Sequence, residues 1–95
     1  MNNRIERTHR ALQHLNKKKI ARTFEDAENR ANITLAVKKL QKKSHRKLLI
    51  LRYGYRINER RIANENGLTE KELKEKLNEA VEALSDVLYP EQERK

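Results

Sequence analysis

The chain has 95 residues, of which 39% are charged and 36% hydrophobic, and it carries a formal net charge of +9. This size predicts one small domain with a thin hydrophobic core, and the absence of cysteine excludes disulfides and thiolate metal ligands. No apolar run approaches the roughly 20 residues of a membrane span, and the first residues lack the apolar stretch of a secretion signal. We therefore expect a cytoplasmic protein without membrane contact, and the positive charge predicts a polyanionic partner.

The positive charge is concentrated in the first half of the chain. Residues 1–47 contain 14 Lys/Arg against 4 Asp/Glu, a net charge of +10, whereas residues 48–95 contain 9 against 10, a net charge of −1. The excess lies in two clusters, which are Lys17, Lys18, Lys19 with Arg22, and Lys38, Lys39, Lys42, Lys43, Arg46 with Lys47. Each cluster is either a solvated face or a surface that contacts phosphates without sequence preference.

Two helices are predicted in this basic half. The first is expected over Asn3–Ile20, because Ile5, Leu12 and Leu15 recur at near-heptad spacing. The second is expected to start at Thr23, which can cap it together with Asp26, and to continue to about Gln41. Its predicted apolar face consists of Phe24, Ala27, Ala31, Ile33, Leu35, Val37 and Leu40. The alanines permit close approach of another helix, within the chain or across a dimer.

Three further helices are predicted in the second half. A helix over Ser44–Tyr53 carries the densest apolar run, and Gly54 is expected to end it. Asn58 can cap a short helix that Gly67 ends. Thr69 and Glu72 have the spacing of a capping box for the last helix. Its apolar positions, with its end near Tyr89 before Pro90, are Leu73, Leu77, Ala80, Val81, Leu84 and Leu88.

These elements predict an all-α protein, a small helical bundle of four or five helices with a C-terminal helix-turn-helix. The segments are a basic helical region over 1–43, a helix-turn-helix domain over 44–89 and a frayed tail over 90–95. Ala63 is small enough for two helices to meet near a turn, and Gly67 makes that turn. The interior of the angle between the helices would be filled by Ile62, Leu68, Leu73 and Leu77.

The second half resembles a known family over 41 residues, Ser44–Leu84. The residues that carry the resemblance are Arg46–Tyr53, Ile62, Ala63, Gly67–Thr69, Leu73, Leu77, Ala80 and Leu84. They resemble region four of bacterial sigma factors, and the chain is similar to ArpU-type phage and prophage regulators. The resemblance implies that the last helix enters the major groove of double-stranded DNA and that the module also contacts RNA polymerase. The family pattern has a leucine where this chain has Asn66.

The first functional hypothesis is a non-enzymatic, DNA-binding transcription regulator from a phage or other mobile element. The predicted phosphate contacts are Lys17, Lys18, Lys19, Arg22, Lys42, Lys43, Arg60 and Arg61, and the predicted base-edge contacts are Lys71, Lys74 and Asn78. Dimerisation through the N-terminal helices is expected, because one short chain reads few bases. However, the last helix carries five Glu and three Lys between Glu70 and Glu82.

That acidic helix supports a second hypothesis, a protein-interaction module in which Glu70, Glu75 and Glu79 dock onto a basic protein. Such a partner could be polymerase, a repressor or a phage-defence factor. A third hypothesis is a DNA-packaging or architectural protein that binds without sequence preference. No metal, cofactor or catalytic group is expected, because His9 and His14 lie on different helix faces and two glycines cannot form a Gly-rich phosphate loop.

Overall fold

The computed structural model describes residues 3–16 and 20–90, and its regular elements within these ranges are helices. In chain order they are α1 (Asn3–Leu12), the 3-10 turn η1 (Gln13–Leu15), α2 (Phe24–Lys38), α3 (Lys43–Leu49), the π-helical turn η2 (Ile50–Gly54), α4 (Glu59–Glu65) and α5 (Glu70–Leu88). The all-α class is thereby confirmed. The predicted contacts Lys17, Lys18 and Lys19, and the tail beyond residue 90, lie outside the described residues.

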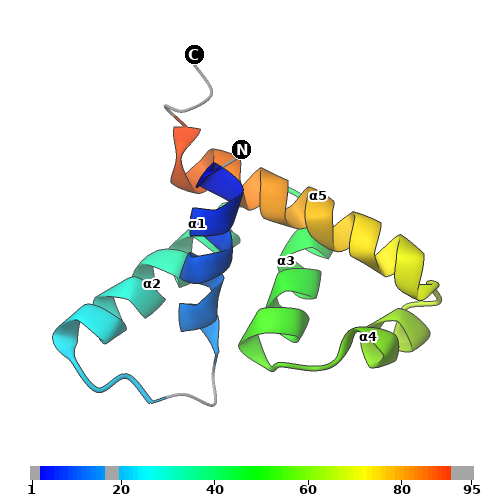
Figure 1. The fold of residues 1–95 in the computed structure, drawn as a ribbon, viewed down its shortest axis with the longest axis horizontal. Coiled ribbons are helices and arrows are strands. Elements are labelled where there is room, and N and C mark those ends of the chain that lie inside the picture. The colour runs from blue at the N-terminus through cyan, green and yellow to red at the C-terminus, as the bar shows by residue number, and fades with distance from the viewer. Residues whose placement is uncertain (1–2, 17–19, 91–95) are drawn as a thin grey trace.

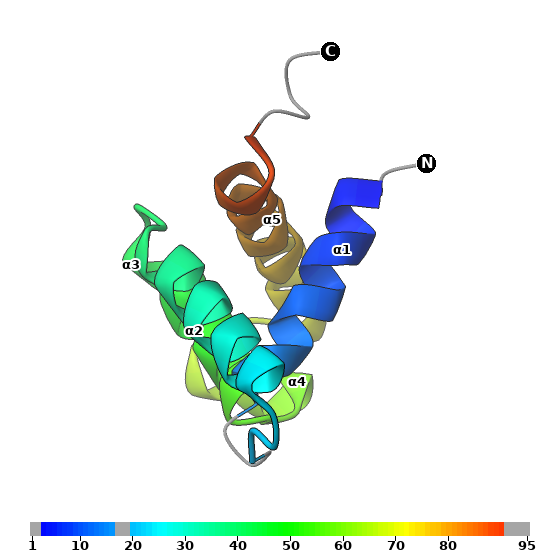
Figure 2. The same ribbon diagram turned by 90° about the vertical axis from the view of Figure 1, so that its left-hand side faces the viewer.

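The long helix α5 is the element that the two halves of the chain share. Figure 1 shows it lying across the molecule, with α1 and α2 beside its C-terminal half, α3 beside its middle and α4 beside its N-terminal end. Viewed from the side, α1 and α2 come closest at their lower ends and diverge upwards, with the end of α5 between them (Figure 2). Every other helix therefore depends on α5 for part of its packing.

Side-chain caps fix the starts of three helices at the predicted residues. The Thr23 hydroxyl accepts the Asp26 N–H at 3.0 Å, and the Asn58 side chain accepts the Arg61 N–H at 2.9 Å. At α5 the capping box is complete, because Thr69 accepts the Glu72 N–H at 3.1 Å and the Glu72 carboxylate accepts the Thr69 N–H at 3.0 Å. These bonds satisfy backbone donors that a helix start leaves without a partner.

Two predicted helix ends were wrong. The first helix was expected to reach Ile20, but helical structure ends at Leu15, and Ile20 lies outside it with 82% of its surface exposed. The second helix ends at Lys38 rather than near Gln41. A tight turn follows, in which the Leu40 N–H donates to the Val37 carbonyl at 3.1 Å, and this turn places the Leu40 side chain in the core. The apolar spacing correctly predicted that Leu40 is buried. It did not predict that Leu40 lies beyond the end of α2, in the turn that follows.

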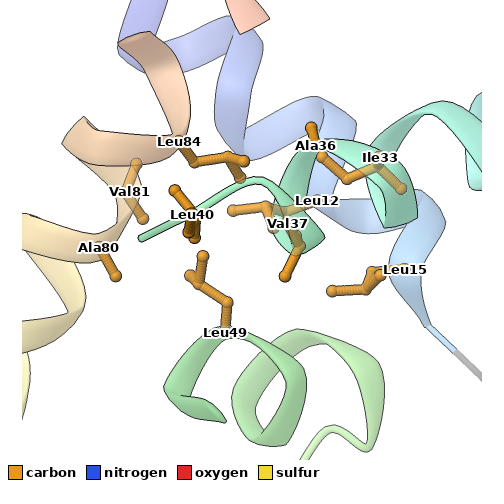
Figure 3. Close-up of a cluster of buried hydrophobic side chains, with 10 residues drawn as sticks. All are labelled: Leu12, Leu15, Ile33, Ala36, Val37, Leu40, Leu49, Ala80, Val81 and Leu84. Atoms are coloured by element: carbon orange, nitrogen blue, oxygen red, sulfur yellow. The ribbon is translucent and has the colours of Figure 1, made fainter. Parts of the chain in front are cut away.

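The larger core joins both halves of the chain. It consists of Leu12, Leu15, Ile33, Ala36, Val37, Leu40, Leu49, Ala80, Val81 and Leu84, and Figure 3 shows these side chains converging between the helices. A buried hydrogen bond of 3.1 Å between the hydroxyls of Thr8 and Ser85 also connects α1 to α5. Residues on both sides of position 43 therefore form one core.

A smaller core lies between α3, α4 and the first half of α5. It consists of Leu48, Ile62, Ala63, Leu73 and Leu77, with Leu51, Ile57 and Leu68 packed against it. The backbone of Gly67 has φ of +69°, a conformation that favours glycine. The Leu68 N–H then donates to the Ala63 carbonyl at 2.8 Å, which closes the turn between α4 and α5. Of the four residues predicted to fill this angle, Ile62, Leu73 and Leu77 belong to the cluster and Leu68 packs against it.

The apolar residues of α2 do not form the single face that was predicted. Ile33 and Val37 are buried as expected, and Ala36 joins them. Four others face solvent, namely Phe24, Ala27, Ala31 and Leu35. The reason is the helical period of 3.6 residues, which places these four on the side of α2 opposite Ile33.

Candidate nucleic-acid interface

The segment 38–47 carries the densest positive charge among the described residues. It contains six Lys/Arg and no Asp/Glu, and it connects the end of α2 to the first turns of α3. Its five exposed cations are Lys38, Lys39, Lys42, Lys43 and Lys47. The sixth, Arg46, is partly buried and donates to the Leu40 carbonyl. Arg46 thus holds the turn, while the five lysines are exposed and can meet phosphates, although the Lys47 ammonium also donates to the Asn66 side chain.

The turn of segment 38–47 forms one wall of an open groove beside α5. The groove has a volume of about 410 Å³ and is lined by Lys39, Leu40, Gln41, Lys42 and His45 on one side and by Ala83, Asp86 and Val87 on the other. Asp86 is paired with Arg4 of α1 at 2.6 Å. The wall of the groove that the turn forms is therefore cationic, and the opposite wall carries the Asp86 carboxylate of α5.

Arg22 is not brought to this segment. It precedes α2, whereas Lys42 follows it, and a helix of 15 residues separates the two by about 22 Å along its axis. Its backbone N–H donates to the Asp26 carboxylate at 3.3 Å, which supports the start of α2. The predicted phosphate set is thus divided, and only Lys42 and Lys43 of that set belong to segment 38–47.

Arg60 and Arg61, both predicted to contact phosphates, are exposed but have carboxylate partners. The Arg60 guanidinium lies 3.0 Å from Glu70 of α5, and the Arg61 guanidinium lies 3.1 Å from Glu65 of α4. Exposed ion pairs of this kind are weak, about 0–1 kcal/mol, so a phosphate could displace them. Even so, each arginine brings a negative charge with it, and α4 as a whole has no net charge.

The base-edge residues Lys71, Lys74 and Asn78 are all exposed on α5. Lys74 and Asn78 line a cleft of about 200 Å³ whose other walls include His9, Tyr53 and Glu59. Burial raises the pKa of the Tyr53 phenol, the positive charge of Arg52 opposes this rise, and the carboxylate of Glu59 adds to it. The side chains of Lys74 and Asn78 therefore lie next to His9 of α1 and Glu59 of α4, and not on an isolated helix surface.

Apart from Lys76, the other exposed charged residues of α5 are acidic. Glu75, Glu79, Glu82 and Asp86 are exposed and follow one another at steps of four, three and four residues, a spacing that keeps them on one side of the helix. We call these four residues the acidic ridge. Glu75 and Glu79 were predicted as docking residues, and the same spacing could have identified Glu82 and Asp86. The third predicted docking residue, Glu70, lies outside the ridge and is paired with Arg60, and within the ridge Asp86 is paired with Arg4.

The Asn66 side chain, at the position where region four of sigma factors has a leucine, makes polar contacts. Its side-chain amide donates to the Ile62 carbonyl at 2.7 Å, and its side-chain oxygen accepts from the Lys47 ammonium at 3.3 Å. Asn66 thus caps the end of α4 and links the turn to α3. The apolar area lost at this position is offset by hydrogen bonds, a substitution that sequence reasoning could not evaluate.

Comparison with family models, curated proteins and solved structures gives no match for this chain. The resemblance to region four therefore rests on the residues of the chain itself. Among the described residues, no group of His, Asp and Glu side chains could hold a metal ion. No helix in the described ranges is long and apolar enough to cross a membrane.

Proposed function

We propose that the protein is a non-enzymatic, DNA-binding regulator whose affinity for the phosphate backbone comes from segment 38–47. The observation that carries this proposal is the group of five exposed lysines in a stretch without a carboxylate. Positive charge gathered on one surface element is the electrostatic footprint of nucleic-acid binding. On α5, by contrast, lysines and carboxylates alternate along the helix, and such mixed charge does not indicate nucleic-acid binding.

In this proposal α4, the turn at Gly67 and α5 form a helix-turn-helix of the region four type. Support comes from the buried Ala63 at the helix contact, the positive φ of Gly67 and the small core of Ile62, Leu73 and Leu77. Base reading would fall to Lys71, Lys74 and Asn78. Because the acidic ridge lies on the same helix, we expect sequence preference to be modest compared with phosphate affinity.

Phosphate binding by segment 38–47 would make DNA affinity depend steeply on salt concentration. Each phosphate neutralised by a lysine contributes a slope of about −0.9 to the plot of log K against log salt concentration. Five contacts would give a slope of roughly −4 to −5, and a loss of affinity of about 10²–10³ between 50 and 200 mM salt. A measured slope near −1 would mean that the segment does not bind phosphates as a unit.

The experiment is a binding titration with two duplexes at two salt concentrations, one of random sequence and one from the region upstream of the protein's own gene. Preference for the upstream site that survives higher salt supports a sequence-specific regulator. Equal, steeply salt-dependent binding to both duplexes supports a packaging or architectural protein, with the same segment on the phosphates. Absence of binding at low salt contradicts both.

A second candidate function is favoured by the acidic ridge. Four exposed carboxylates on one side of α5 are suited to a basic protein surface, such as one on RNA polymerase or another regulator. The double variant Glu75→Lys/Glu79→Lys separates the candidates. If α5 approaches DNA, the variant binds random duplex more tightly, whereas if α5 docks onto a basic protein, DNA binding is unchanged and binding of that protein is lost.

A further inference from the structure

Helix α2 has a second apolar face that no described part of the chain covers. Phe24, Ala27, Ala31 and Leu35 are spaced three, four and four residues apart, so they lie along one side of the helix. Phe24 is 82% exposed and Leu35 is 57% exposed, and both alanines are exposed as well. We call these four residues the outer stripe. The outer stripe lies on the side of α2 opposite the buried Ile33 and Val37, so α2 carries apolar side chains on both sides.

The position of α2 leaves the outer stripe open to another molecule. In Figure 1 α2 lies at the edge of the molecule farthest from α4, and Figure 2 shows it in front when viewed from that edge. Single exposed apolar side chains are normal on protein surfaces. Here, however, a Phe and a Leu lie at the two ends of one stripe with two alanines between them, and small residues at the centre allow two helix backbones to approach closely.

The charges around the stripe indicate which partner fits it. The first turns of α2 are acidic, with Glu25 and Glu28 exposed, and its end is basic, with Lys38 and Lys39 exposed. A second α2 running antiparallel would place the first turn of each copy, with Glu25, near Lys38 and Lys39 of the other, whereas Glu28 would lie closer to the centre of the contact. A parallel pair would instead place like charges together. The charge pattern is thus complementary to itself in the antiparallel arrangement.

We propose that two copies of the chain associate through the outer stripe, with their α2 helices antiparallel. Ala27 and Ala31 lie near the two-fold axis, and Phe24 of each copy packs towards the end of the partner helix that carries Leu35. Such an isologous contact closes on itself and gives a dimer rather than a fibre. The dimer would present two copies of segment 38–47, but its formation does not depend on DNA.

The size of the stripe sets the expected affinity. Phe24 to Leu35 spans about 16 Å of helix, so the contact is at the small end of specific interfaces. We therefore expect a dissociation constant on the order of micromolar, rather than nanomolar. Long-range attraction between the acidic and basic ends also makes the dimer weaker at high salt.

Sedimentation equilibrium of the full chain without nucleic acid, over a range of protein concentrations, tests this proposal. The wild-type chain should show a monomer–dimer equilibrium. Leu35→Lys and Ala31→Gln should each weaken the dimer at least about tenfold, by burying a charge or by separating the backbones. Both positions are exposed and both new residues are good helix formers, so helix content measured by circular dichroism should not change.

Tyr55→Lys is the matched control, because Tyr55 is another half-exposed apolar side chain, 49% exposed, that lies outside the stripe. It should leave the dissociation constant unchanged. A monomer at every concentration, or a dimer that Leu35→Lys and Ala31→Gln do not weaken, overturns the proposal. Either result leaves the DNA-binding proposal intact, because no DNA is present.

A charge exchange tests the antiparallel arrangement. Glu25→Lys alone and Lys39→Glu alone should each weaken the dimer, since each replaces attraction by repulsion at two symmetric places. The double variant should recover most of the wild-type affinity, because the pairs are restored with their signs reversed. Recovery in the double variant supports antiparallel helices. Its absence, with the single variants weakened, would overturn that arrangement.

Discussion

Segment 38–47 and helix α5 differ most in charge, although both are exposed and both carry lysines. The segment has six Lys/Arg and no carboxylate, whereas α5 has three Lys and six Asp/Glu. The helix whose place in the fold resembles a reading helix is therefore the less favourable of the two for a phosphate backbone. In one small protein, therefore, the helices suited to reading DNA and the positive charge that attracts its phosphates can lie on different elements.

The difference has a structural basis. α5 is needed on its buried side by both cores, through Leu73 and Leu77 at one end and Leu84 at the other. Its exposed carboxylates contact neighbouring elements, as in the Glu70–Arg60 pair and the Glu79–His45 contact of 3.8 Å. Segment 38–47 is anchored by the buried Leu40, by Arg46, by the contact of His45 with Glu79 and by the bond from Lys47 to Asn66. Its other four lysines are exposed, so they are available for a partner.

The largest effect is expected from reversing charge in segment 38–47. The double variant Lys42→Glu/Lys43→Glu should weaken binding to random duplex by about 100-fold at moderate salt and flatten the salt slope by roughly two. The measurement is fluorescence anisotropy at several salt concentrations. Both residues are exposed, and a carboxylate near the start of α3 is favourable for the helix, so the fold should persist.

The matched control reverses the charge of two residues outside the proposed contacts, Arg10→Glu/Lys76→Glu. Both residues are exposed, and the net charge of the protein changes by the same amount. We expect a loss of about threefold or less, from the general change in field. If the two double variants weaken binding equally, segment 38–47 has no special part in phosphate contact.

The next largest effect is on stability. Gly67→Ala should lower the free energy of unfolding by about 1–2 kcal/mol, because alanine is strained at a φ of +69°. An added Cβ would contact nothing within 4 Å, so strain is the only cost. Urea titration measures this change, and Asn64→Ala in the preceding helix is the control. The salt slope of DNA binding should stay as in the wild type, whereas a changed slope would link the turn to the phosphate contacts.

A smaller effect on DNA affinity is expected from removing the carboxylate that pairs with an arginine of α4. Glu70→Gln removes the carboxylate partner of Arg60, and we expect DNA affinity to rise about threefold, close to the 0–1 kcal/mol of an exposed ion pair. Glu6→Gln is the control, since it removes an exposed carboxylate from the first turn of α1. An equal rise in both variants would reflect net charge alone and would remove Arg60 from the interface.

The smallest effect concerns pH and the cleft beside Lys74 and Asn78. Burial raises the pKa of Tyr53 above its ordinary value of 10.0, so the folded chain holds the phenol proton more tightly than the unfolded chain. The stability from this difference is complete below pH 10 and is lost as pH rises through the folded-state pKa. Thermal unfolding above pH 10 should therefore lose stability more steeply in the wild type than in Tyr53→Phe, and equal slopes would contradict the burial of Tyr53.

Local signals in the sequence were predictive where the structure depends on neighbouring residues. The caps at Thr23, Asn58 and Thr69 involve partners three residues away, and the left-handed turn at Gly67 needs only one residue type. The residues between α4 and α5 were also identified correctly, because their spacing matches a known pattern. DNA binding, regulation and the helix-turn-helix assignment remain proposals.

Signals that depend on distant residues were not predictive. The apolar positions of α2 form two stripes, and the spacing alone does not say which stripe meets the core and which faces water. Likewise, Glu70 was a docking candidate, although its carboxylate lies beside Arg60 of a different helix. The bond from Arg46 to the Leu40 carbonyl depends on the turn that ends α2, which the sequence placed three residues too late.

The most direct test of the central claim is to map the surface that touches DNA. Isotope-labelled protein would be titrated with a random-sequence duplex, and the amide chemical shifts would be followed by NMR. The account predicts that the largest changes occur in segment 38–47, with small changes at Lys71, Lys74 and Asn78. Largest changes along α5, with segment 38–47 unaffected, would contradict it.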